Sequence, residues 1–108
     1  LVMCGLNPAS MDLPMLKKSL EHVDSWAPRY FSHRVHDLHT AALTYARVFG
    51  CPIPPSGFQT DDIYAMLEMN PEPKPHVAVN GVMWESQAFA KIYRDLLTVS
   101  ESARSAQI

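Results

Sequence analysis

The stretch "PHVAVNGVMWESQAF", Pro75–Phe89, decides the fold, because two interpretations of it lead to different architectures. In the first, an apolar strand ends at Asn80–Gly81 and a helix follows, since Asn-Gly between alternating apolar residues is the strongest short hairpin signal. In the second, a helix begins at Ala78, directly after a histidine, His76, that carries chemistry. Glycine inside a helix costs about 1 kcal/mol relative to alanine, so the local signal favours the strand and turn.

Composition limits the size and the environment of the protein. The 108 residues are 47% apolar, which is enough for one small domain whose core needs no metal or disulfide. The net charge of −2 argues against a broad electrostatic grip on nucleic acid, although metal ions can bind phosphate in place of basic side chains. The wide separation of Cys4 and Cys51 argues against a structural zinc site and predicts a reduced, cytoplasmic protein. No run of about 18 apolar residues is present, so we expect no membrane partner.

Apolar periodicity predicts an α/β chain with few short strands and about four helices. The predicted elements are strands over 1–4 and 34–36, and helices from Ser10 through Val23, over 38–49, over 62–69 and over 84–99. Asp37 is the predicted N-cap of the second helix and Gly50 its C-cap. Residues 1–99 are expected to form a single partial domain and residues 100–108 a flexible tail. Two short strands cannot complete an α/β sheet, so further strands are expected from a partner or from a missing part of the protein.

Three segments contain the residues that could carry chemistry. They are, in chain order, "MCGLNPASMDLPMLKKSLE", "RVHDLHTAALTYARVFG" and "HVAVNGVMWESQAFAKIY". In the first, a strand leads through Asn7 to Asp12 at the opening of a helix, and in the third, His76 and Ala78 precede the last helix. This order resembles the second half of the DEDDh 3′–5′ exonucleases, which have a ribonuclease H-like fold. The resemblance covers nearly the whole chain, and it implies a partial ribonuclease H-like domain.

The resemblance also implies roles for individual residues. Asp12 matches the carboxylate that binds metal in the family's second motif, Asn7 lies at a substrate-binding position, and His76 matches the general base. The implied cofactor is Mg²⁺ or Mn²⁺, and the implied substrate is the 3′ end of a single-stranded nucleic acid. Two metal ions stabilise the attacking and leaving oxygens of such a reaction, and an imidazole that titrates near neutrality suits the base.

The sequence departs from the family's pattern in two places. The pattern requires an Asp-x-Glu pair on its first strand, and these residues contain none. It also requires Asp five residues after the histidine, where this chain has Gly81, and the neighbouring Asn80 is a poor substitute ligand for Mg²⁺. We therefore expect an exonuclease-like protein that is incomplete or catalytically impaired as this chain. The absent motif is expected from an N-terminal half that these residues do not include or from a second copy in a homo-oligomer; otherwise the chain binds no metal.

Alternative interpretations remain open. Asp12 can be simply an acid that favours the helix dipole. The chain can be a non-catalytic binding or scaffold protein that self-associates through an open sheet edge. It can also be a thioredoxin-like α/β domain without redox cysteines, which predicts a cis bond before Pro75 and a strand after it. Three imidazoles recur every three residues across a predicted strand–helix boundary, so they are not expected to share a metal. They are His33, His36 and His39.

Overall fold

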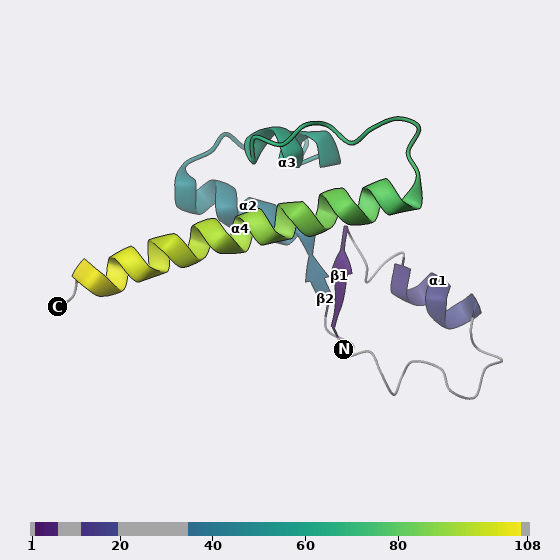
Figure 1. The fold of residues 1–108 in the computed structure, drawn as a ribbon, viewed down its shortest axis with the longest axis horizontal. Coiled ribbons are helices and arrows are strands. Elements are labelled where there is room, and N and C mark those ends of the chain that lie inside the picture. Colours follow the sequence, from purple (N-terminus) through teal and green to yellow (C-terminus); the bar gives the residue numbers. More distant parts are fainter. Residues whose placement is uncertain (1, 7–11, 20–34, 107–108) are drawn as a thin grey trace.

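The computed structural model describes residues 2–6, 12–19 and 35–106. This part of the chain is a mixed α/β structure, mostly helical, with a two-stranded parallel sheet and four helices (Figure 1). The elements are β1 (Met3–Gly5), α1 (Asp12–Ser19), β2 (Val35–Asp37), α2 (Leu38–Phe49), α3 (Thr60–Met66) and α4 (Ala78–Ala106). None of the helices in the described part is long and apolar enough to cross a bilayer.

Helix α4 settles the two interpretations of Pro75–Phe89. It begins at Ala78, and the Gly81 N–H donates to the Val77 carbonyl at 3.2 Å, so the predicted strand and Asn-Gly turn are wrong. The Lys74–Pro75 peptide bond is cis, as the thioredoxin-like alternative predicted, but the residues that follow it form α4 and not the strand that this alternative requires. The helix also continues beyond the predicted end at Val99.

The predicted caps of α2 are confirmed. Asp37 Oδ2 accepts hydrogen bonds from the Thr40 N–H at 3.2 Å and from Thr40 Oγ1 at 3.0 Å. Gly50 adopts a left-handed φ of 68°, which glycine tolerates without strain, and the Cys51 N–H donates to the Ala46 carbonyl at 2.8 Å. Both ends of α2 are therefore fixed by local chemistry that the sequence displays.

Three helices enclose one hydrophobic core. The buried residues come from α2, α3, α4, the connector before α3 and the residue directly after α3. They are Leu38, Ala42, Tyr45, Ala46, Phe58, Ile63, Tyr64, Leu67, Ala88 and Ile92. A hydrogen bond of 2.8 Å from the Tyr45 hydroxyl to Asp95 Oδ2 joins α2 to α4 at the edge of this core. The long helix α4 thus packs across α2, and the loop before α4 lines one pocket together with the start of α3.

The sheet consists of β1 and β2 alone in the described part of the chain. The strands pair in parallel with Met3 opposite Val35, Cys4 opposite His36, and Gly5 opposite Asp37. Parallel sheets are usually larger and covered on both faces, and an isolated pair of strands is marginally stable in water. This architecture fits part of an α/β domain.

Several predicted boundaries differ from the observed ones. Helix α3 begins at Thr60 and ends at Met66, earlier than predicted at both ends, and Glu68 follows with a positive φ of 59°. Helix α1 begins at Asp12, and the other residues of the longer predicted helix, before and after α1, lie outside the described residues.

Candidate functional site

The clearest polar pair near the start of α4 consists of His76 and Glu72. Nδ1 of His76 is hydrogen-bonded to Glu72 Oε2. The side chain of Glu72 is only 11% exposed, whereas that of His76 is 63% exposed. In the Nδ1–H tautomer of the neutral ring, Nδ1 donates to this carboxylate and Nε2 is an acceptor. This geometry presents a proton-accepting nitrogen to the solvent.

The loop that carries this pair is tied to α4 near its beginning. The indole Nε1–H of Trp84, in the second turn of α4, donates to the Asn70 carbonyl at 2.7 Å. Prolines at 71, 73 and 75 surround Glu72, and each proline ring fixes its own φ. The Glu72 backbone therefore has little freedom to move away from the first turns of α4.

A polar pocket of about 400 Å³ surrounds the imidazole. Its residues come from the start of α3, the following loop and α4, and they are Gln59, Thr60, Asp61, Glu72, His76 and Glu85. The start of α3 is fixed by a 2.9 Å hydrogen bond from the Gln59 N–H to Asp62 Oδ2. The pocket contains carboxylates and no Lys or Arg among the described residues that line it, so it repels an anionic phosphate unless cations accompany the phosphate.

Tyr64 is buried near this acidic pocket, and the pocket's carboxylates affect the pKa of its hydroxyl. Burial, and then the nearby carboxylates of Glu85, Glu72 and Asp61, raise the pKa of Tyr64 to about 12. Its hydroxyl is buried and has no hydrogen-bond partner among the described residues. The described residues also contain no group of three His, Cys, Asp or Glu side chains placed to hold a metal ion. The pocket therefore does not form a metal centre with these residues alone.

The structure describes only some of the site residues that the sequence predicts. His76 lies in the loop directly before α4, and Asp12 is the first residue of α1. Helix α1 and the first turn of α4 lie toward the same end of the molecule's long axis (Figure 1). Asn7 and the side chain of Asp12 lie outside the described residues, so their convergence with His76 stays a prediction.

Sequence reasoning missed Glu72, which the structure places beside Gly81. A Cβ atom added at Gly81 would lie 3.3 Å from Glu72 Oε1, closer than nearly all Cβ contacts in proteins. Gly81 is the position where the family's pattern has an acid, and the carboxylate beside that position comes from Glu72 instead. The available signal was an acid four residues before the histidine in a proline-rich run, and that signal has no meaning until the loop conformation is known.

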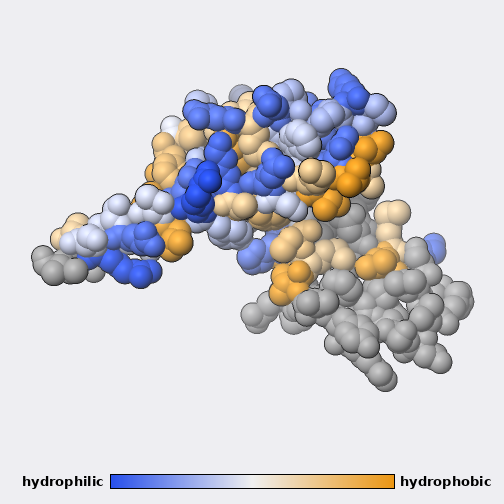
Figure 2. Space-filling view, in the orientation of Figure 1, coloured by the Kyte–Doolittle hydropathy of each residue, from blue (hydrophilic) through white to orange (hydrophobic). Residues whose placement is uncertain are grey.

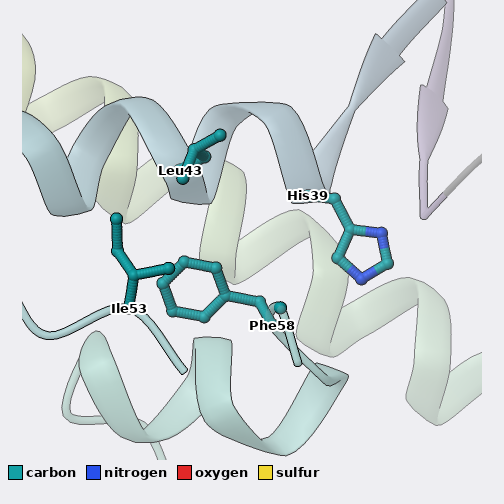
Figure 3. Close-up of a pocket in the computed structure, with 5 residues that line it drawn as sticks. His39, Leu43, Ile53 and Phe58 are labelled. Atoms are coloured by element: carbon teal, nitrogen blue, oxygen red, sulfur yellow. The ribbon is translucent and has the colours of Figure 1, made fainter. Parts of the chain in front are cut away.

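Two other pockets separate the remaining histidines. In one, Nδ1 of His36 lies 2.6 Å from the hydroxyl of Tyr93, beside the end of β2. The other is an apolar pocket in which His39 and Leu43 of α2 face Ile53 and Phe58 of the connector (Figure 3). His36 and His39 therefore line different pockets and do not share a site, and His33 lies outside the described residues.

The chain was compared with protein-family models, with curated proteins and with solved structures, and none of the three comparisons found a match. The interpretation of its function rests on its own residues and their geometry.

Proposed function

We propose that this chain belongs to a 3′–5′ exonuclease-like, nucleic-acid-processing protein with a ribonuclease H-like fold, and that its 108 residues form an incomplete or catalytically impaired version of that domain. The observation that carries the proposal is the start of α4 at Ala78, two residues after His76, because the His-x-Ala pattern requires a helix there. A parallel strand pair and a helix that opens at Asp12 provide the context expected for the second motif.

His76 is the proposed general base. In this proposal, Nε2 accepts a proton from the attacking water while a lone pair of the water oxygen forms the new bond to phosphorus. The bond between phosphorus and the 3′ oxygen breaks, and its electron pair leaves on that oxygen, which takes a proton from solvent. Asn7 contacts the substrate, which is the 3′ end of a single-stranded nucleic acid. Asp61 and Glu85 line the same pocket, so the phosphate of the substrate needs accompanying cations to enter it.

Asp12 is the proposed ligand for Mg²⁺ or Mn²⁺. These ions prefer carboxylate oxygens, and the described residues supply no complete set of ligands. The remaining acids have to come from an Asp-x-Glu strand in a missing N-terminal half or in a partner, added at the open edge of the β1–β2 sheet. A protein whose set of metal ligands stays incomplete is the impaired form of the proposal, and it hydrolyses its substrate slowly.

The test is a hydrolysis assay on the protein as its gene encodes it. Single-stranded RNA and DNA, labelled at the 5′ end, are incubated with Mn²⁺, and shortening from the 3′ end is followed on a gel. We expect slow shortening that falls at least about 100-fold in His76→Ala, the size typical for loss of a catalytic proton acceptor. Asp12→Asn, which removes the proposed metal ligand, should lower the rate to a similar extent. His39→Ala is the matched control, because His39 lines a different pocket, and it should retain the rate. Absence of Mn²⁺-dependent shortening, or shortening that survives both substitutions, would overturn the proposal.

A second candidate function is self-association as a binding or scaffold protein. It is favoured by apolar side chains of α4 that are exposed although the opposite side of the helix packs in the core. They are Val79, Val82, Met83, Tyr93 and Leu97. Figure 2 shows hydrophobic surface gathered over the first turns of α4. Light scattering tests this function. Self-association predicts twice the monomer mass for the wild type and the monomer mass for Val82→Asp. A wild-type protein that stays monomeric at high concentration rejects self-association.

A further inference from the structure

We propose that Glu72 is a positioning residue that fixes the Nδ1–H tautomer of His76, and that Gly81 provides the space that keeps the Glu72 carboxylate in place. The inference rests on the proposed function only for the use of His76 as a base. Its structural content, a carboxylate that selects one tautomer, is independent of any nucleic acid or metal.

The first observation is the difference in burial within the pair. The carboxylate of Glu72 is largely covered, and the imidazole of His76 is largely open to solvent. The covered group is therefore the fixed member, and the open group is the one that it orients. One carboxylate oxygen is bonded to Nδ1, which leaves Nε2 as the nitrogen that accepts a proton. Once Nε2 is protonated, the same carboxylate stabilises the imidazolium.

The second observation is the contact between Glu72 and the start of α4. Helix α4 has no acidic residue in its own first turn, where the partial positive charge of a helix favours one. Glu72 supplies a carboxylate at this place from outside the helix, with Oε1 against Gly81. A side chain at position 81 would have to displace that oxygen by a few tenths of an ångström. This contact gives a reason for glycine at position 81, although glycine is a weak helix former.

The third observation is the restraint on the loop. The hydrogen bond from Trp84 to the Asn70 carbonyl pins the chain two residues before Glu72, and prolines lie on both sides of that residue. The carboxylate therefore reaches His76 from a constrained backbone, so little conformational freedom is lost when the pair forms.

The tautomer is measured directly by NMR. Long-range ¹H–¹⁵N spectra of ¹⁵N-histidine-labelled protein, recorded at about pH 8.5 and well above the usual histidine range, distinguish Nδ1–H from Nε2–H. We expect Nδ1–H to dominate at His76. In Glu72→Ala the ratio of the two forms should shift by about fivefold toward Nε2–H. This factor corresponds to about 1 kcal/mol, the upper end of the free energies measured for solvent-exposed ion pairs. Gly81→Ala, which leaves both partners intact, should shift it in the same direction.

Asp61→Asn is the matched control, because it removes a carboxylate from the same pocket without touching His76. It should leave the tautomer ratio unchanged, and far-UV circular dichroism confirms that each variant is folded. An Nε2–H form at His76 in the wild type, or a ratio unaffected by Glu72→Ala, would overturn the inference. These results are distinguishable from failure of the hydrolysis assay. Activity that depends on His76, found together with the Nε2–H form, would support the proposed function and reject only the positioning role of Glu72.

Discussion

Two tyrosines in the core differ in one respect, and the difference predicts opposite effects of the same substitution. The Tyr45 hydroxyl donates to Asp95 Oδ2 at 2.8 Å, whereas the Tyr64 hydroxyl is buried with no partner among the described residues. Both side chains are buried, so replacement by phenylalanine preserves the packing of each ring. Tyr45→Phe and Tyr64→Phe therefore isolate the contributions of a paired and an unpaired buried hydroxyl.

The magnitudes follow from the partners of each hydroxyl. A hydrogen bond to a charged acceptor contributes about 1.5–3 kcal/mol, and the Asp95 side chain is 30% exposed, so water replaces part of the lost interaction. We expect Tyr45→Phe to lower the free energy of unfolding by about 1–1.5 kcal/mol. An unpaired buried hydroxyl opposes folding by about 1–3 kcal/mol, so Tyr64→Phe should leave the stability unchanged or raise it by about 1–2 kcal/mol.

Urea unfolding monitored by circular dichroism measures both effects. The slope of the free energy against urea should be the same in both variants, because the surface exposed on unfolding hardly changes. The two variants should then differ by roughly 1–3.5 kcal/mol in the free energy of unfolding, the difference of the two estimates above. Equal stabilities, or a loss of more than about 1 kcal/mol in Tyr64→Phe, would show that the hydroxyls are not paired and unpaired as described.

Three further predictions concern the core and the ends of α2. Burial, then the acids nearby, raise the pKa of Tyr45 and of Tyr64 to about 12 from 10. The unfolded chain therefore ionises first as the pH rises, and the free energy of unfolding should fall between pH 10 and 12 by about 1.4 kcal/mol per pH unit for each phenol, measured by urea titration. A flat profile contradicts this. Ile92→Ala, at a fully buried position, should cost about 2–5 kcal/mol, and a loss below about 1 kcal/mol would place Ile92 outside the core. Gly50→Ala should lower the melting temperature through a loss of about 1 kcal/mol in stability, because alanine is strained at the left-handed φ of 68°, although no atom lies near the added carbon. An unchanged melting temperature would contradict a left-handed C-cap at Gly50.

The parts of the fold that depend on neighbouring residues were predictable from the sequence. Helix α2 carries its cap at Asp37, its stop at Gly50 and an apolar face between them, and the structure has all three. Helix α4 was ambiguous because Asn80–Gly81 gives a strong local turn signal. The predicted part of this helix, from Trp84, contains the fully buried Ala88 and Ile92. The added turns before Trp84 are exposed at Val79 and Val82, and no local signal in the sequence predicts them.

The candidate site shows the same division. His76 stood out because it matches the histidine of the third motif in the family that the sequence resembles. Glu72 did not, because its contact with His76 depends on the path of a proline-rich loop and on the Trp84 hydrogen bond that holds it. The contact with Gly81 adds a reason for the missing side chain at that position, which the sequence alone presents only as a departure from a pattern.

Convergence of Asp12 and His76 on one cleft is tested most directly by paramagnetic relaxation from Mn²⁺. The ion is titrated at low concentration into ¹⁵N-labelled protein with a nucleoside 5′-monophosphate. We predict that the amide signal of Asp12 and the ring signals of His76 broaden together, and that both effects disappear in Asp12→Asn. Broadening confined to the acidic pocket around His76, or unchanged in Asp12→Asn, would contradict the proposed shared site.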